Sequence, residues 1–338
     1  MKETTMFTTR LNRRAWLGAG VAALCTALAG LPVQAQDLSF PSKTVRVITP
    51  FPVGSGPDVA LRVVANHLAA KWGQAVIVDN RPGGNGFIAI SGLKQGPADG
   101  HVLVQLDSNH LTTHPHTFSK LPYDPQKDLE PIRPLFRNNF FVAVSAESPF
   151  KSIDDIITTA RPDPTKVSYG SWFNGSPGHL GALRLAQMKG ISMMHVPFKD
   201  MNQMYMAVAN REVDWALGSA ASAGALEKAG KLRFLAITGP ARSKAYPQVP
   251  SVDDRPGTKG YEVAAWTGLF SPKGTPKAVR EKISADVLEV LRLADVVERY
   301  SGFGYEVFDA GPDAYADAIR RETASWADVI RAANLKLD

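Results

Sequence analysis

The feature that most constrains this chain is a strand–turn–helix unit that occurs twice, far apart in the sequence. The first unit runs from Val45 through a glycine- and serine-containing turn to Asp58, and the second runs from Val167 through a similar turn to His179. Neither turn contains lysine or arginine. Such a turn aims free backbone N–H groups and the positive end of a helix dipole at one point, so it can hold an anion without a basic side chain. Two such turns predict two lobes that grip one small acid.

The length and the order of elements indicate an α/β fold with two Rossmann-like lobes. The 338 residues exceed the size at which a single core usually keeps growing, and 44% hydrophobic with 21% charged residues is ordinary for a soluble globular chain. From Val45 onward, apolar strands alternate with helices, which predicts mostly parallel sheets covered by helices. Strands are expected at residues 45–49, 75–79, 101–106, 142–144, 167–169, 193–197, 213–217 and 232–238.

A weak internal repeat marks where the chain passes between the lobes. Residues 140–145 and the following helix resemble residues 266–271 and the helix after them, so crossings are expected near Arg137 and Glu262. The prediction is a discontinuous first lobe, residues 36–137 plus 263–338, and a second lobe, residues 138–262.

Other segments are assigned from periodicity and composition. Ser152 and Asp155 have the spacing of a capping box. The proline-rich segments 120–134 and 246–256 are expected as extended surface connections. A C-terminal helix is expected to dock on the first lobe through one apolar stripe, formed by Tyr315, Ile319, Trp326 and Ile330.

The N-terminus resembles an export signal. Three arginines at positions 10, 13 and 14 precede an apolar run at residues 15–31, and cleavage is expected after Ala35. The pair Arg13-Arg14 leaves twin-arginine and general secretory export open, and a retained membrane anchor is the rival interpretation.

Removal of residues 1–35 changes both the charge and the cysteine content. Four basic residues and one acidic residue leave, so the formal charge falls from +6 to +3, which is too small to favour nucleic acid. The only cysteine, Cys25, leaves as well, so no disulfide or cysteine metal site is expected. We expect an exported, periplasmic protein that is a monomer.

An ordered series of short motifs extends from about Phe40 to about Ile330. The motifs are Pro50-Phe51-Pro52-Val53-Gly54, Asp58, Asn80-Arg81-Pro82-Gly83, Asp99-Gly100, Leu121-Pro122-Tyr123-Asp124-Pro125, His179-Leu180, His195-Val196-Pro197-Phe198-Lys199, Val213-Asp214, Gly230-Lys231-Leu232-Arg233 and Val249-Pro250-Ser251. In this order they resemble the Bug-type solute receptors of the tripartite tricarboxylate transporter family.

The resemblance implies a type II periplasmic binding protein with Venus-flytrap architecture. Such a receptor closes around a small carboxylate and delivers it to a membrane permease, without a cofactor or a metal. The family typically has glycine where this chain has Ser55, Phe173 and Asp200, and these departures bear on which acid is bound.

The turns and the resemblance together give the candidate ligand-binding residues. In the first lobe these are Phe51, Pro52, Val53, Gly54, Ser55, Gly56, Asp58, Asn85, Asp107 and Ser108, and in the second lobe Ser171, Trp172, Phe173, Asn174, Gly175, Ser176, His179, Phe198 and Asp200.

Several of these residues have an alternative interpretation. Asp58 more readily satisfies backbone N–H groups at a helix start than contacts an anion, and the two serines can act as caps alone. Adjacent Trp172 and Phe173 either wall the cleft for an aromatic or bulky acid or pack beneath the loop.

Two further function classes stay open at this point. Ser176 and His179 stand three apart at a helix start, which keeps an exported α/β hydrolase as an alternative, although no acidic partner is evident. A sensor that passes its closed form to a signalling protein would use the same cleft. His110, His114 and His116 match no strong zinc signature, and the segment around Pro115 is expected as a loop.

Overall fold

The computed structural model describes residue 1 and residues 40–338. The predicted signal peptide, its cleavage site near Ala35 and Cys25 lie outside the described residues.

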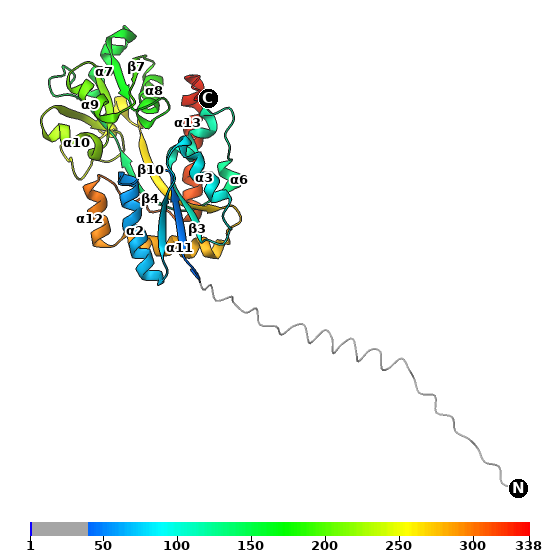
Figure 1. The fold of residues 1–338 in the computed structure, drawn as a ribbon. Coiled ribbons are helices and arrows are strands. Elements are labelled where there is room, and N and C mark those ends of the chain that lie inside the picture. The colour runs from blue at the N-terminus through cyan, green and yellow to red at the C-terminus, as the bar shows by residue number, and fades with distance from the viewer. Residues whose placement is uncertain (2–39) are drawn as a thin grey trace. The chain divides into compact units, whose positions relative to one another are not determined.

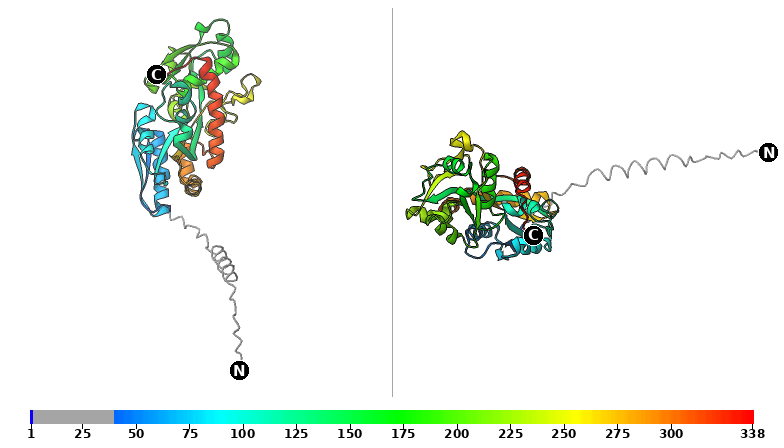
Figure 2. Two further views of the ribbon diagram at one scale, coloured as in Figure 1. Left: turned by 90° about the vertical axis from the view of Figure 1, so that its right-hand side faces the viewer. Right: turned by 90° about the horizontal axis from the view of Figure 1, so that it is seen from above.

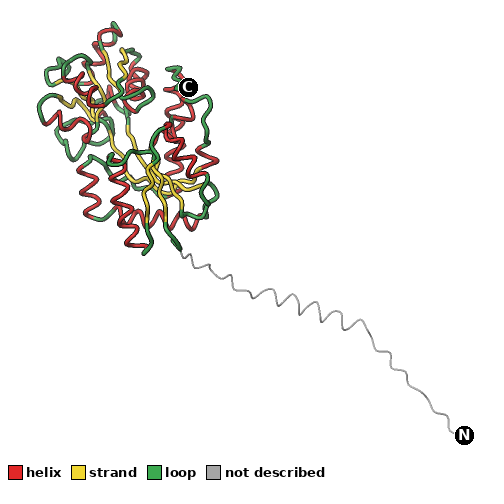
Figure 3. The backbone as a smooth tube through the Cα atoms, in the orientation of Figure 1, coloured by secondary structure: helices red, strands yellow, loops and turns green. Residues whose placement is uncertain are grey.

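Residues 40–338 contain two mixed β-sheets, each of five strands, and Figure 3 shows the two groups of strands separately. The first sheet has the order β2-β1-β3-β10-β4, and the second has the order β7-β6-β8-β5-β9. The strands are β1 (Val45–Thr49), β2 (Val76–Asn80), β3 (Val102–Asp107), β4 (Leu129–Asn139), β5 (Phe141–Ser145), β6 (Ser168–Ser171), β7 (Met194–Pro197), β8 (Trp215–Gly218), β9 (Leu232–Ile237) and β10 (Ala264–Pro272). The predicted two-lobed α/β fold is confirmed.

Helices surround both sheets (Figure 1). Around the first sheet they are α2 (Gly56–Trp72), α3 (Phe87–Lys94), α4 (Ser108–Thr112), α5 (His114–Thr117), α6 (Pro125–Asp128), α11 (Lys277–Leu291) and α12 (Ala294–Gly302). Around the second they are α7 (Ile153–Ala160), α8 (Pro177–Lys189), α9 (Met201–Ala209) and α10 (Ala220–Lys228), and α13 (Pro312–Ala332) ends the chain. Short 3-10 turns are η1 (Gly84–Gly86), η2 (Pro164–Lys166), η3 (Val252–Asp254) and η4 (Pro256–Thr258). Ser152 and Asp155 form the predicted capping box at α7.

Strand directions bring the carboxyl ends of the parallel strands of both sheets to the crossings between them. In the first sheet, β1 and β3 are parallel, and β10 begins where β3 ends, with Thr267 opposite Asp107. In the second sheet, β6 and β8 are parallel, and β5 begins where β8 ends, with Phe141 opposite Gly218. Because β4 leads into β5 within two residues, the turns that follow β1 and β6 lie at adjoining sheet edges.

Thr238 ties the two crossings together. Its side chain is fully buried, and its Oγ1 accepts a hydrogen bond from Phe140 N (3.0 Å) and donates one to Val263 O (2.6 Å). The main chain of Thr238 bonds to the same two residues. The chain leaves the first sheet after β4 and returns to it with β10. This supports the lobe limits that we propose, residues 36–137 plus 263–338 for the first lobe and residues 138–262 for the second.

β4 occupies part of a segment expected as a surface connection. Ile132 and Leu135 on this strand are fully buried, and the strand pairs along its length with β10. The prolines that suggested a connection, Pro131 and Pro134, lie beside two register shifts in this pairing. β4 is an edge strand, and proline is tolerated on edges and at bulges because its missing N–H removes no essential ladder bond.

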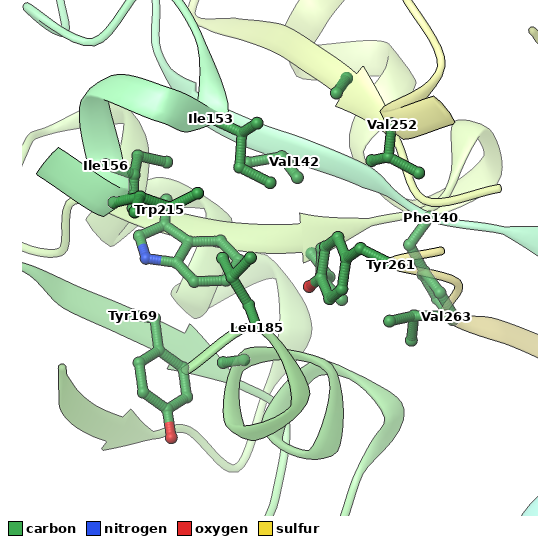
Figure 4. Close-up of a cluster of buried hydrophobic side chains, with 14 of the residues drawn as sticks. Phe140, Val142, Ile153, Ile156, Tyr169, Leu185, Trp215, Val252, Tyr261 and Val263 are labelled. Carbon is green, nitrogen blue, oxygen red and sulfur yellow. The ribbon is translucent and has the colours of Figure 1, made fainter. Parts of the chain in front are cut away.

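The second sheet encloses a core around Trp215, whose side chain is fully buried. Figure 4 shows Trp215 among aliphatic and aromatic side chains from several elements. Its labelled neighbours include Val142, Ile156, Tyr169 and Leu185. This core gives the second lobe a rigid base for the turn that follows β6.

α13 packs on both lobes, whereas the sequence predicts docking on the first lobe. Tyr315 and the partly buried Ile319 pack in a cluster with Trp266 and Phe270 of β10. Further along, Trp326 and Ile330 belong to the core of the second lobe, the cluster that also contains Trp215. The helix, red in Figure 2, is therefore shared by the two cores.

Among residues 40–338, no helix has the length and apolarity needed to span a membrane.

The shared packing of α13 predicts a large cost for truncating its second half. Ile330→Ala should lower the free energy of unfolding by about 2 to 5 kcal/mol, because Ile330 is only 2% exposed in the second core. Ile88→Ala is the matched control: Ile88 is a helical residue that is 52% exposed, so its loss should stay within about 0.5 kcal/mol. Urea unfolding measures both, and equal losses would contradict the shared packing.

Candidate functional site

Buried polar side chains of β1 and β3 hydrogen-bond to both ends of the first turn, residues 51–55. Thr49 Oγ1 accepts a hydrogen bond from Phe51 N (3.3 Å) and donates one to Gln105 Oε1 (2.8 Å). Gln105 Nε2 in turn donates to Pro57 O at the start of α2 (3.1 Å). Strands β1 and β3 thereby fix both ends of the turn.

Asp58 anchors the same turn from the first turn of α2. Its buried carboxylate accepts hydrogen bonds from Gly54 N (2.8 Å), Asn80 Nδ2 (2.7 Å) and Arg62 Nε (3.1 Å). Burial favours the neutral acid, but these hydrogen bonds and the charge of Arg62 outweigh it and hold the pKa of Asp58 below its usual value. The arrangement favours the capping interpretation of Asp58 over direct ligand contact.

The anchoring narrows the set of amides that can bind an anion. Of the N–H groups from Val53 to Gly56, that of Gly54 is used by Asp58, and that of Ser55 donates to Pro52 O (3.2 Å). No hydrogen bond among residues 40–338 engages the N–H of Val53 or Gly56. Two donors therefore remain open, that of Val53 within the turn and that of Gly56 at the first residue of α2, and the Val53 side chain is 73% exposed.

In the second turn, both candidate serines are fully buried and already hydrogen bonded. Ser171 Oγ lies 2.7 Å from His195 Nε2, and it donates to Phe173 O (3.2 Å). Ser176 Oγ accepts from His179 N and caps α8. The serine hydroxyls therefore shape the turn. The N–H groups of Phe173 and Asn174 have no hydrogen-bond partner within the described part of the chain.

A stack of rings holds the second turn. The His179 and His195 rings lie 4.0 Å apart with 5° between their planes, and Tyr169 stacks on His195 at 4.9 Å. His179 Nδ1 accepts a hydrogen bond from Gly175 N (3.0 Å), which requires a neutral ring. Burial, followed by the neighbouring His195, lowers the pKa of His179 to about 4. This geometry makes Ser176 and His179 a cap and a turn support, because the His179 ring does not bond the Ser176 hydroxyl.

The adjacent aromatics of the second turn have different environments. Trp172 is partly buried and packs against the cluster that contains Trp215 and against a second cluster that contains Met204. Its ring centroid lies 5.7 Å from that of Phe140. Phe173 is 50% exposed. Only Phe173 is therefore free to present an aromatic face at the turn.

Other candidates are helix caps or buried or partly buried residues, and Asn85 is exposed. Asp107 caps α4, with Oδ1 2.6 Å from His110 Nδ1, and Asp200 caps α9 by accepting from Gln203 N (2.9 Å). Ser108 is buried. Phe198 packs against the core formed by Met204 and its neighbours, and Asn85 lies exposed in η1 with a positive φ of 51°.

The three histidines after β3 lie in the short helices α4 and α5, where a loop was expected. Gly86 leaves room for the His110 ring, because a Cβ at residue 86 would collide with it. Burial, followed by the charge of His110, lowers the pKa of His114 to about 3. Residues 40–338 contain no group of three His, Cys, Asp or Glu side chains placed to hold a metal ion.

Some supporting residues were missed from the sequence. Thr49 and Gln105 lie inside strands with no local signal, and their pairing depends on the register of β1 and β3. Ser219 was also missed: it caps α10 at the end of β8, beside β6, with Ser222 completing a capping box. A serine three residues before another polar residue, directly after a strand, could have indicated this cap.

The neutral state of these histidines predicts acid sensitivity. The pKa of His179, about 4, and that of His114, about 3, lie below the ordinary 6.5, so the unfolded chain binds more protons. The contribution of these neutral histidines to the free energy of unfolding is therefore fully present above about pH 6.5 and is lost as the pH drops toward 4. His179 accounts for up to about 3 kcal/mol of it.

Urea unfolding at pH 7, 5.5 and 4 measures this loss. His179→Asn keeps an acceptor for Gly175 N but cannot titrate, so its stability should fall less steeply with acid than that of the wild type. Parallel pH profiles for the two proteins would contradict the assignment.

Comparison with known proteins shows that the chain matches a protein family. Residues 60–335 match the family described as "Tripartite tricarboxylate transporter family receptor". The chain is 30% identical over 311 residues to a protein from the tcbD-tcbE intergenic region of Pseudomonas sp. (strain P51), which covers 92% of each chain.

Two solved structures are also similar. Rpa4515 of R. palustris with adipate is 28% identical, with a TM-score of 0.74 over 88% of this chain and 99% of that one. MatC from Rhodopseudomonas palustris with bound malate is 26% identical, with a TM-score of 0.70 over 86% of this chain and 100% of that one. The matched family consists of solute-binding receptors, not enzymes, which removes the hydrolase alternative. The chain belongs to the tripartite tricarboxylate transporter family of receptors.

Proposed function

We propose that this receptor captures a small carboxylate between its two lobes in the periplasm and delivers it to a tripartite tricarboxylate transporter permease. The observation that carries the proposal is the pair of turns with open amides, at Val53 and Gly56 after β1 and at Phe173 and Asn174 after β6. Backbone N–H groups in turns that lead into helices suit a carboxylate, because the positive end of the helix dipole adds to their hydrogen bonds. The solved structures of Rpa4515 with adipate and of MatC with bound malate support the same ligand class.

Closure follows from contact with both turns. An acid that touches both lobes only when they are shut binds the closed form better and shifts the equilibrium toward it. A difference of about 3 kcal/mol would move that equilibrium by roughly 150-fold. The crossings at Thr238 are where such a movement would bend.

Phe173 supports a preference for long or aromatic acids. Its side chain is half exposed at the turn, whereas Trp172 is held in the core. An exposed aromatic ring beside the carboxylate donors would cover the apolar part of the ligand.

The N-terminal 35 residues, as the predicted signal peptide, support export.

Calorimetric titration tests the proposal with adipate, malate, benzoate and the neutral diamide of adipate. The carboxylates should bind and the diamide should not, since only the charged ligands gain from the helix dipoles. Phe173→Ala should weaken adipate and benzoate about 5- to 10-fold more than malate. Met188→Ala, an exposed apolar residue near the other end of α8, is the control and should change nothing. Binding of the diamide as tight as that of adipate would contradict the carboxylate assignment.

A further inference from the structure

A short segment after α12 lies where the two lobes meet beside α2. Glu306 N donates to Arg137 O and Arg137 N donates to Glu306 O, both at 2.8 Å, near the end of β4. Gly304 lies against α10 of the second lobe, since a Cβ at residue 304 would be 2.8 Å from Ala220 Cβ. Figure 1 shows α12 and α2 side by side, and the Tyr300 hydroxyl bonds Ala60 O between them. Residues 304–306 thus adjoin a crossing strand, α2 and α10.

Tyr305 is held in one orientation within this segment. Its ring stacks on Phe136 with centroids 3.9 Å apart and 5° between the planes, and Tyr300 packs edge-on at 6.3 Å. Phe136 itself is buried, so it provides a fixed platform. The phenol points at the start of α2, because a Cβ at Gly56 would collide with the Tyr305 hydroxyl.

The Tyr305 hydroxyl has no hydrogen-bond partner among residues 40–338, although the residue is partly buried. The adjacent Gly56 N–H is one of the two open amides of the first turn. An N–H group and an O–H group therefore lie close together at the start of α2, and neither is bonded to an acceptor among residues 40–338. Burial raises the pKa of the Tyr305 hydroxyl to about 12, so it keeps its proton and remains a donor at neutral pH.

We propose that Tyr305 is a ligand-contacting residue whose hydroxyl donates a hydrogen bond to the carboxylate held by the Gly56 amide. This inference rests on the proposed function and assigns one further donor to its first-lobe subsite. A charged acceptor strengthens such a bond relative to a neutral one, so Tyr305 adds to the preference for an ionised acid. The need for space beside the phenol also accounts for glycine at position 56.

Removal of one oxygen atom tests this role. Tyr305→Phe keeps the ring stack on Phe136, so the urea midpoint should stay near the wild-type value while the Kd for adipate rises about 10-fold at pH 7. Tyr300→Phe is the matched control, because the hydroxyl of Tyr300 contacts Ala60 O and not the turn. Its Kd should stay within about 2-fold of wild type.

The possible outcomes separate the two proposals. A selective loss in Tyr305→Phe supports the inference. Adipate binding by Tyr305→Phe as tight as by wild type, or an equal loss in both variants, overturns the inference while the proposed function stands. A wild-type protein that binds none of adipate, malate and benzoate overturns the proposed function, and this inference with it.

Discussion

Backbone N–H groups in the turns that lead into α2 and α8 are the donors on which the proposed anion site depends, because residues just ahead of a helix lack an intrahelical acceptor. Two side chains that the sequence predicts as ligand contacts accept hydrogen bonds from N–H groups of these turns. Asp58 takes the N–H of Gly54, and His179 takes that of Gly175. The turns are thereby rigid, while a small set of amides in each lobe stays open.

The proposed closure would have to bend the segments that link the two sheets. The sheets are linked through Phe140 and Val263, and both bond to the buried Thr238. α13 adds a second link, since it contributes Tyr315 to one core and Trp326 to the other. Any closure must therefore be accommodated by the packing of this helix as well as by the crossing strands.

Local sequence signals predicted the elements that depend on neighbours in the chain. The limits of β1 and the Ser152 capping box agree with the prediction, because strand periodicity and cap spacing are local properties. The prolines at the bulges of β4 gave a false signal of a surface connection, since edge position cannot be read before the sheet order is known. The packing of α13 on two cores was missed for the same reason, because the apolar stripe of a helix does not show which sheet it will contact.

The candidate site was predictable to the same extent. The two turns and their glycines were visible, but the division between open and occupied amides depends on partners distant in sequence. Asn80 reaches Asp58 from 22 positions away, and His195 reaches Ser171 from 24. The hydroxyl of Tyr305 comes from near the opposite end of the chain, so no local motif could place it beside Gly56.

A crystal structure of the adipate complex tests the central claim most directly. The account predicts ligand carboxylate oxygens within hydrogen-bond distance of Val53 N or Gly56 N in one lobe and of Phe173 N or Asn174 N in the other. A bound acid held by side-chain cations elsewhere, with these amides still facing solvent, would contradict it.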